Sequence, residues 1–148
     1  GEYGVWGKHT LFEESLRSPL IISYDNILKP GQPSTAIVET VDILPTICDL
    51  AQIPAPANRA GTNLNTQLKD PGSQGHSALA FQRNRITIRN KQYRLIVHKN
   101  GFRELYDFSD PNNVSINRAQ ELPEMVNALE EQLNQRLIDT GTKSVALW

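Results

Sequence analysis

The chain has 148 residues, of which 39% are hydrophobic, so it can bury one ordinary core with a smaller lobe attached. Fifteen basic residues against sixteen acidic ones give a formal net charge of -1, which excludes a general attraction to nucleic acid or to an anionic membrane. A single cysteine, Cys48, excludes an internal disulfide framework, and no apolar run approaches the ~18 residues that a membrane span needs.

The first half of the chain predicts short elements of an α/β fold. Thr10 and Glu13 have the spacing of a capping box, which predicts a helix that ends before Pro19. In a second helix, Cys48 would be a small buried thiol. The apolar patterns predict, in chain order, a helix, a strand covered on both faces, a short strand and a helix, over residues 10–17, 19–24, 35–39 and 41–51.

The second half predicts an antiparallel sheet followed by a helix. Proline, glycine and asparagine dominate residues 52–75, which we expect to separate two parts of the chain, 1–70 and 76–148. Short connections rich in turn residues then link four strand-like segments, over residues 78–82, 86–90, 93–98 and 104–108. The last helix is expected over 122–139, with an apolar stripe that packs on the sheet, formed by Met125, Leu129, Leu133 and Leu137.

Basic residues are concentrated over residues 81–94. Because apolar side chains alternate with them, the favoured interpretation is that these charges lie on a solvated face of the sheet. A local surface for an anionic substrate is the alternative. RNA binding is disfavoured, because the stretch lacks the stacked aromatic residues of single-strand readers.

The glycine-rich start of the chain resembles a phosphate loop only superficially. That loop would need glycine where Glu2 stands and serine or threonine where His9 stands, so nucleotide binding is disfavoured. Gly4, Gly7 and Lys8 can still hold an anion, because glycines let the backbone approach a ligand and lysine supplies a cation. No G-x-S-x-G motif occurs, and the three histidines show no metal-ligand spacing.

Three blocks in order carry a family resemblance: "GEYGVWGKHTLFEESLRSPLII", "VETVDILPTICDLAQIP" and "IRNKQYRLIVHKNGFRELYDFSDPNNVSIN". Together they resemble the C-terminal part of the sulfatases, within the alkaline-phosphatase-like superfamily. The subgroup they look most similar to contains iduronate-2-sulfatase and its bacterial relatives. The resemblance implies an α/β fold whose catalytic domain ends within residues 1–70, followed by a four-stranded antiparallel sheet packed on a C-terminal helix within residues 76–148.

The resemblance also implies roles for individual residues. Lys8 falls where sulfatases place a lysine that binds the sulfate group and helps to stabilise or protonate the leaving oxygen. Trp6 and His9 are similar in position to residues that line the substrate pocket, although Trp6 could equally be packed under the loop. Glu13 matches a position that looks structural. Sulfatases use a formylglycine nucleophile and a calcium ion, whose residues are absent from this chain and are expected upstream of it.

The resulting expectation is a fragment of a sulfatase that hydrolyses sulfate esters, plausibly of sulfated sugars, and that is inactive on its own without the upstream part of the polypeptide. One alternative is a phosphatase or phosphonate hydrolase of the same superfamily. Another is a stand-alone module that binds an anionic glycan or a protein. Family habit implies a periplasmic, extracellular or lysosomal enzyme.

Overall fold

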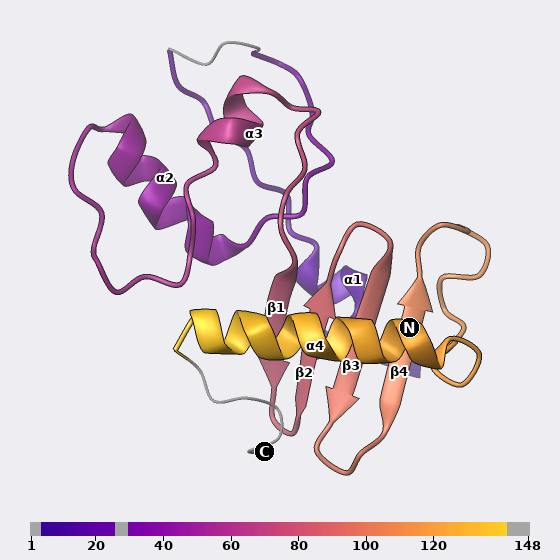
Figure 1. Ribbon diagram of the computed structural model, residues 1–148. Coiled ribbons are helices and arrows are strands. Elements are labelled where there is room, and N and C mark those ends of the chain that lie inside the picture. The colour runs from indigo at the N-terminus through magenta and orange to yellow at the C-terminus, as the bar shows by residue number, and fades with distance from the viewer. Residues whose placement is uncertain (1–3, 26–29, 142–148) are drawn as a thin grey trace. The chain divides into compact units, whose positions relative to one another are not determined.

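The computed structural model describes residues 4–25 and 30–141 (Figure 1). Its elements are α1 (Glu13–Leu16), η2 (Thr40–Asp42), α2 (Ile43–Leu50), α3 (Asn65–Lys69), β1 (Ala78–Gln82), β2 (Arg85–Arg89), β3 (Tyr93–His98), β4 (Arg103–Asp107) and α4 (Pro123–Asp139). The contacts divide the chain into two compact units. The sheet unit contains the described residues up to Leu20 and those from Leu79 onward, and the loop unit contains Ile21–Ala78.

The sheet unit is built on four strands in the order β1-β2-β3-β4 (Figure 1). The two pairings β2–β3 and β3–β4 are antiparallel, as expected for strands joined by short turns. The predicted meander is therefore confirmed, with strand bounds within one residue of those read from the sequence. At the β4 edge, the Asn117 side chain accepts a hydrogen bond from the Leu105 N–H (2.9 Å) and donates one to the Arg103 carbonyl (3.1 Å).

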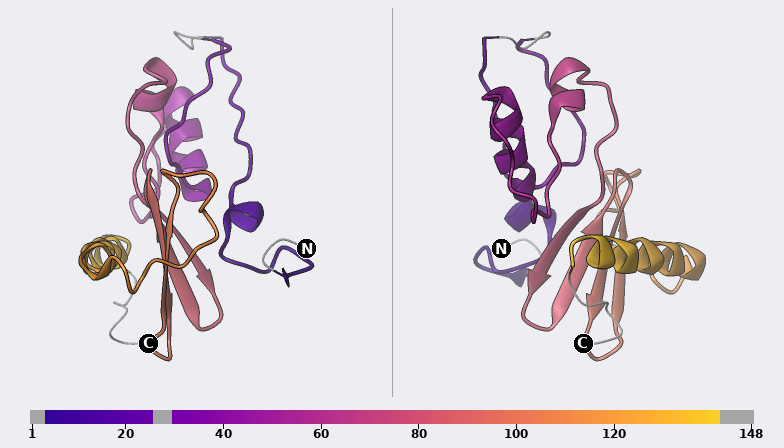
Figure 2. Two further views of the ribbon diagram at one scale, coloured as in Figure 1. Left: turned by 90° about the vertical axis from the view of Figure 1, so that its right-hand side faces the viewer. Right: turned by 60° about the vertical axis from the view of Figure 1, so that its left-hand side comes forward.

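One face of the sheet is covered by α4, which Figure 2 shows lying across the strands. Leu129, Leu133 and Leu137 are fully buried against this face, and Met125 packs at its margin. The sheet contributes a matching set of buried side chains, Ile86, Ile88, Leu95, Val97 and Leu105. These residues alternate along β2 and β3, as the period of two of a strand requires. The predicted stripe is thus the core of the unit.

The opposite face is covered by the chain around α1 rather than by solvent (Figure 2). Leu11 is 2% exposed and clusters there with Ile96 and Tyr106. The Phe12 ring meets the Tyr106 ring edge to face, with 5.6 Å between their centroids. The sheet is therefore the middle layer of three, between α4 and the segment that contains α1.

The loop unit is held mainly by hydrogen bonds and close backbone approach. Gly75 lies so near residue 37 that a Cβ atom would stand 2.0 Å from the Ile37 carbonyl oxygen, and the His76 N–H donates to that oxygen at 3.0 Å. Gly61 meets the Val41 carbonyl in the same way. A side chain at either glycine would push the backbone segments apart, which explains why this unit needs glycine there.

Two predicted strands do not form in the part of the chain that the structure describes. Neither residues 19–24 nor residues 35–39 join a ladder. A strand needs a neighbour for its backbone groups, and none is offered to the first run, where Leu20 is 41% and Ile21 is 89% exposed. In the second run, the Ile37 carbonyl instead accepts a hydrogen bond from the His76 N–H, and the Glu39 N–H donates one to Asp42 Oδ2.

The helices agree with the sequence in place and differ in detail. The helix predicted over 41–51 begins with the short turn η2 and continues as α2. The helix predicted over 10–17 shrinks to α1, and its capping box is wrong, because no side chain caps it. Glu13 instead faces two arginines of the sheet, and Thr10 Oγ1 bonds Ser15 Oγ at 2.6 Å.

Candidate functional site

The residues expected to form the site, Trp6, Lys8 and His9, lie in an irregular segment just before α1. All three are exposed, and Trp6 is 90% exposed, so it is not packed under the loop. The backbone bends through two positive φ angles, +69° at Gly4 and +132° at Gly7, a region that favours glycine. Lys8 is therefore carried by an exposed, irregular segment.

The segment after Lys8 is anchored firmly to the sheet. The His9 carbonyl accepts a hydrogen bond from the Gln82 side chain, and the Leu11 carbonyl accepts one from Arg94 Nη1 at 2.6 Å. The Leu11 side chain is buried against the sheet. Lys8 therefore lies three residues before the buried Leu11, on a segment that these contacts attach to the sheet.

Glu13 attaches the same segment to the sheet through two arginines. Its Oε1 atom accepts hydrogen bonds from Arg89 Nε at 3.1 Å and from Arg94 Nη2. The Arg94 side chain is 4% exposed and that of Arg89 is 11% exposed. Arg89 and Arg94 are directly opposite each other on β2 and β3, a like-charge pairing that is unfavourable by itself. One carboxylate between them offsets that repulsion.

The charges set the protonation of this group. Burial raises the pKa of Glu13, but the nearby charges and hydrogen bonds of Arg94 and Arg89 outweigh burial and hold the pKa below its ordinary value. Burial also lowers the pKa of Arg94, against the opposing effect of Glu13. The Arg89 guanidinium also makes a cation–π contact, at 3.9 Å from the centre of the Phe108 ring.

We call Glu13, Arg89 and Arg94 the clamp. It corrects the interpretation of the basic run over residues 81–94. Arg89 and Arg94 were expected on a solvated face, yet both are buried beneath the α1 segment. They alternate correctly with the apolar residues of the other face, but their face is covered by residues distant in sequence. Both guanidiniums are buried and bonded to Glu13, so neither is presented to a glycan.

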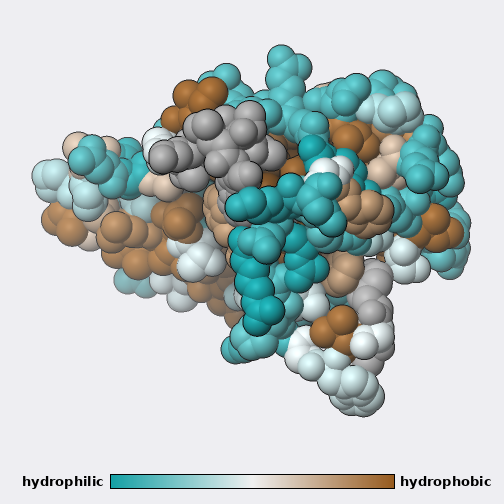
Figure 3. Space-filling view, turned by 90° about the horizontal axis from the view of Figure 1, so that it is seen from below, coloured by the Kyte–Doolittle hydropathy of each residue, from teal (hydrophilic) through white to brown (hydrophobic). Residues whose placement is uncertain are grey.

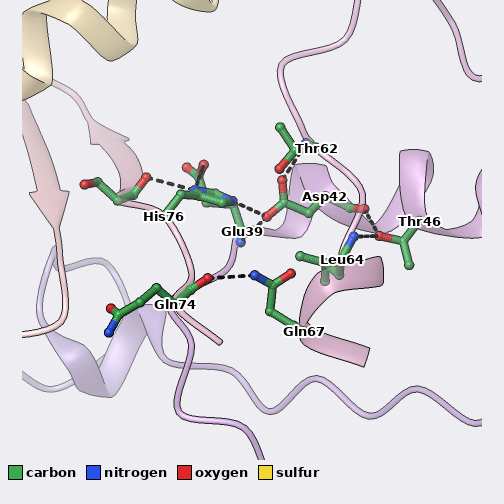
Figure 4. Close-up of polar contacts among 9 residues, drawn as sticks. Glu39, Asp42, Thr46, Thr62, Leu64, Gln67, Gln74 and His76 are labelled. Carbon is green, nitrogen blue, oxygen red and sulfur yellow. Dashed lines mark hydrogen bonds and ion pairs between the residues drawn. The ribbon is translucent and has the colours of Figure 1, made fainter. Parts of the chain in front are cut away.

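A second polar cluster lies in the loop unit, around the fully buried Asp42 (Figure 4). Asp42 Oδ2 accepts the Glu39 N–H at 2.7 Å and lies 2.7 Å from His76 Nε2. Asp42 Oδ1 accepts the Thr62 N–H at 2.9 Å. The carboxylate thus joins three stretches of chain that carry little regular structure.

Glu39, Asp42 and His76 offer ligand atoms that all lie within 4.8 Å of one another, so the fit of a cation has to be considered. Calcium, the metal that the sulfatase resemblance implies, takes six to eight oxygen ligands. Here one of the three groups is an imidazole, and both Asp42 oxygens already accept hydrogen bonds from N–H groups of the chain. The cluster therefore fits a structural network and does not fit calcium.

Sequence reasoning missed both the clamp and this network. The signal for the network was the spacing of Glu39 and Asp42, which form a reciprocal capping box at η2. No local pattern places His76 beside them, because 34 residues separate it from Asp42. Cys48, predicted as a buried thiol in a helix, is confirmed as such at 5% exposure.

Comparison with known protein families gives a match over almost the whole chain. Residues 1–140 match the family described as "N-sulphoglucosamine sulphohydrolase, C-terminal". Over 72 residues the chain is 39% identical to an N-acetylglucosamine-6-O-sulfatase of Bacteroides thetaiotaomicron, covering 49% of the chain and 13% of that protein. Over 115 residues it is 33% identical to a sulfatase of Formosa agariphila, with 76% and 22% covered. Arylsulfatase K of Mus musculus is 28% identical over 151 residues, with 89% and 27% covered.

Solved structures share the architecture. One is a structure in complex with its substrate D-glucosamine-2-N,6-O-disulfate, with a TM-score of 0.72 and 23% identity over 82% of this chain and 28% of that one. Another is a phosphonate monoester hydrolase from Silicibacter pomeroyi, with a TM-score of 0.77 and 20% identity over 91% and 31%. At these identities the likeness establishes the fold, which is the one predicted. The chain spans less than a third of the length of each of these relatives.

Proposed function

Because the chain belongs to the N-sulphoglucosamine sulphohydrolase C-terminal family of sulfatases, we propose that it is the C-terminal part of an enzyme that hydrolyses sulfate esters of sulfated sugars. The observation that carries the proposal is the family match over residues 1–140. The class of substrate is supported by the relative named as an N-acetylglucosamine-6-O-sulfatase and by the neighbour bound to a sulfated glucosamine. The finer resemblance to iduronate-2-sulfatase remains a prediction.

Lys8 is the residue of this chain that we assign to the chemistry. Hydrolysis of a sulfate ester leaves negative charge on the departing sugar oxygen, which needs a cation or a proton. An ammonium held in place before the reaction supplies this at low cost, because it does not have to reorganise. The exposed position of Lys8 on an anchored segment supports the role. Trp6 and His9 would line the substrate pocket on either side of it.

The remaining machinery belongs to the upstream part of the polypeptide in this proposal. The formylglycine nucleophile and the calcium ligands would lie there, since Cys48 is buried in α2 and the Asp42 cluster does not fit calcium. We therefore propose that the 148-residue chain alone is inactive. Within the full enzyme, residues 1–70 would complete the catalytic domain and residues 76–148 would form the subdomain of sheet and helix.

Two alternatives remain distinguishable. The phosphonate hydrolase neighbour shares the fold, but the named sequence relatives are sulfatases, which favours sulfate. A stand-alone module that binds anionic glycans through the basic strands is disfavoured, because Arg89 and Arg94 are already bonded to Glu13.

For location, we propose a periplasmic, extracellular or lysosomal enzyme. Among the described residues, no helix has the length and apolar character needed to cross a membrane.

The test is Lys8→Ala in the full polypeptide, assayed on N-acetylglucosamine 6-sulfate and on a phosphonate monoester. Loss of one positioned charge-stabilising group typically costs about 100- to 1,000-fold in kcat, and we expect a fall of that order with sulfate. Lys99→Ala, at an exposed turn of the sheet, is the matched control and should keep full activity. Activity on the phosphonate alone would replace the sulfatase proposal, and a Lys8→Ala enzyme with unchanged kcat would remove Lys8 from the chemistry.

A further inference from the structure

Two polar side chains meet across the turn between β1 and β2. Gln82 is the last residue of β1 and Arg85 is the first of β2, and Arg83 between them has a φ of +50°, as two-residue turns commonly require. Arg85 Nη2 donates a hydrogen bond to Gln82 Oε1. Figure 3 views the molecule from the side on which Figure 1 draws this turn, and hydrophilic side chains gather over the middle of that face. Polar contacts therefore fix the pair at this end of the sheet.

The chemistry of this contact decides which way the Gln82 amide points. A guanidinium carries only donors, so it selects the amide oxygen and leaves the amide nitrogen on the other side. That nitrogen donates to the His9 carbonyl, which can only accept. With the amide reversed, two donors would meet at Arg85 and two acceptors would meet at His9. Both neighbours therefore favour the same orientation of one side chain, which makes its bond to the Lys8 segment directional.

Of the attachments described above, the one from Gln82 to His9 is nearest to Lys8 along the chain. The next attachment is at Leu11, two residues further on. On the other side of Lys8, Gly7 has a φ of +132°, in a region that a residue without a Cβ atom enters easily. The backbone of Lys8 thus lies between a permissive glycine and a residue that Gln82 holds, so the bond at His9 limits how far that backbone can rotate.

We propose that Gln82, oriented by Arg85, is a positioning residue for Lys8 in the hydrolysis of the sulfate ester. The inference rests on the proposed function, because it takes the role of Lys8 from there. A charge-stabilising group is most effective when it is in place before the reaction, and a displacement of about 1 Å can cost about 100-fold in rate. Gln82 would act through the backbone at His9. Arg85, a member of the basic run over residues 81–94, would serve to orient an amide and not to bind a glycan.

A purely structural role for Gln82 is the competing interpretation, and a glutamate at this position separates the two. Gln82→Glu keeps the length of the side chain and its contact with Arg85, which becomes an ion pair. It replaces the N–H donor with a carboxylate oxygen, which the His9 carbonyl repels. The substitution should therefore preserve the fold and release the backbone beside Lys8.

The experiment measures Gln82→Glu in the full polypeptide with N-acetylglucosamine 6-sulfate as the substrate. Gln120→Glu, at an exposed turn before α4, makes the same chemical change away from the Lys8 segment and is the matched control. For Gln82→Glu we expect kcat to fall at least about 10-fold, while KM changes by less than about 3-fold and the melting temperature by less than about 2 °C. Gln120→Glu should match the parent in all three quantities.

Combining each substitution with Lys8→Ala shows whether Gln82 acts through Lys8. If it does, Gln82→Glu should change kcat by less than about 2-fold in the Lys8→Ala protein, because the group to be positioned is gone. Arg85→Met covers the case in which Gln82→Glu fails to fold. Without the donor that orients the amide, kcat should fall at least about 3-fold, and again only when Lys8 is present.

The outcomes separate this inference from the proposed function. An active parent whose Gln82→Glu variant keeps its kcat would overturn this inference alone. Equal losses of kcat with and without Lys8 would do the same, because they would show that Gln82 acts independently of the lysine. A parent polypeptide without sulfatase activity would overturn the proposed function, and this inference with it.

Discussion

Replacing Glu13 with glutamine tests whether one carboxylate holds the Lys8 segment on the sheet. The substitution keeps the size of the side chain and removes its charge. Arg89 and Arg94 would then face each other across β2 and β3 without the carboxylate that both of them contact, in a site where their side chains are 11% and 4% exposed. The Arg94 bond to the Leu11 carbonyl would remain, so the loss concerns the charge itself.

The expected cost follows from the burial of the three groups. Removing one partner of a buried ion pair costs about 3–5 kcal/mol, because the charge left behind is unpaired. The Glu13 side chain is 22% exposed, which places it at the lower end, at about 3 kcal/mol. For a chain of this length, that free energy corresponds to a melting temperature lower by roughly 6–12 °C.

The stabilisation should also depend on pH. Because the pKa of Glu13 is lower in the folded state, its contribution is present above the ordinary pKa of 4.5 and is lost as the pH falls through the folded value below it. The parent protein should therefore lose stability on acidification below about pH 4.5, and the glutamine variant should lack this part of the decline.

Chemical unfolding followed by circular dichroism, at pH 7 and at a series of pH values below the ordinary pKa of 4.5, gives both quantities. Glu131→Gln, at an exposed position of α4, is the control and should stay within about 0.5 kcal/mol of the parent. If Glu13→Gln unfolds within that same margin, or keeps the full acid dependence, the clamp does not hold the segment and the reasoning is wrong.

Two further substitutions test the other parts of the fold. Asp42→Asn should destabilise the loop unit by about 2–3 kcal/mol, because each Asp42 oxygen accepts an N–H group and the amide keeps only one acceptor oxygen. Amide hydrogen exchange at His76 should accelerate, and unchanged exchange would contradict the network. Leu133→Ala should cost about 2–5 kcal/mol in urea unfolding, because Leu133 is 0% exposed between α4 and the sheet; a cost below 1 kcal/mol would mean that α4 is not the core helix.

The sheet and α4 could be predicted from the sequence because their information is local. Alternation along each strand, turn residues between strands and the spacing of the Leu stripe are all contained within short windows. The observed strand β3, Tyr93–His98, has the bounds that this pattern predicts. Such elements bury their apolar faces against each other, so local pattern and final packing agree.

The elements that failed depend on partners that the pattern does not contain. The apolar run at residues 19–24 has the composition of a buried strand, but a strand exists only when another strand accepts its backbone bonds. The structure described here provides none, and Ile21 is 89% exposed. Similarly, α2 was predicted in place while its orientation, with Thr46 buried and Leu44 exposed, was not, because periodicity identifies an apolar face without telling which neighbour will cover it.

The arginines of the sheet show the same limit for charge. Arg89 and Arg94 occupy the face that alternation assigns them, and a solvated face is the usual outcome for such positions. In this chain Glu13, 81 residues away from Arg94, pairs with both arginines and allows them to be buried. Sequence spacing can place two charges on one face of a sheet, but the third charge that makes burial possible comes from a distant segment.

That third charge also links the fold to the proposed chemistry. A buried ion cluster is an expensive way to gain stability, since apolar residues of similar size often do as well or better. The charged cluster does give a defined position, because its bonds are directional and its partners are fixed on β2 and β3. The segment it holds has only four residues of helix, so regular structure cannot position Lys8. Under the proposed function, Lys8 has to meet a developing charge without moving, and the attachment of its segment to the covered face of the sheet would keep it in place.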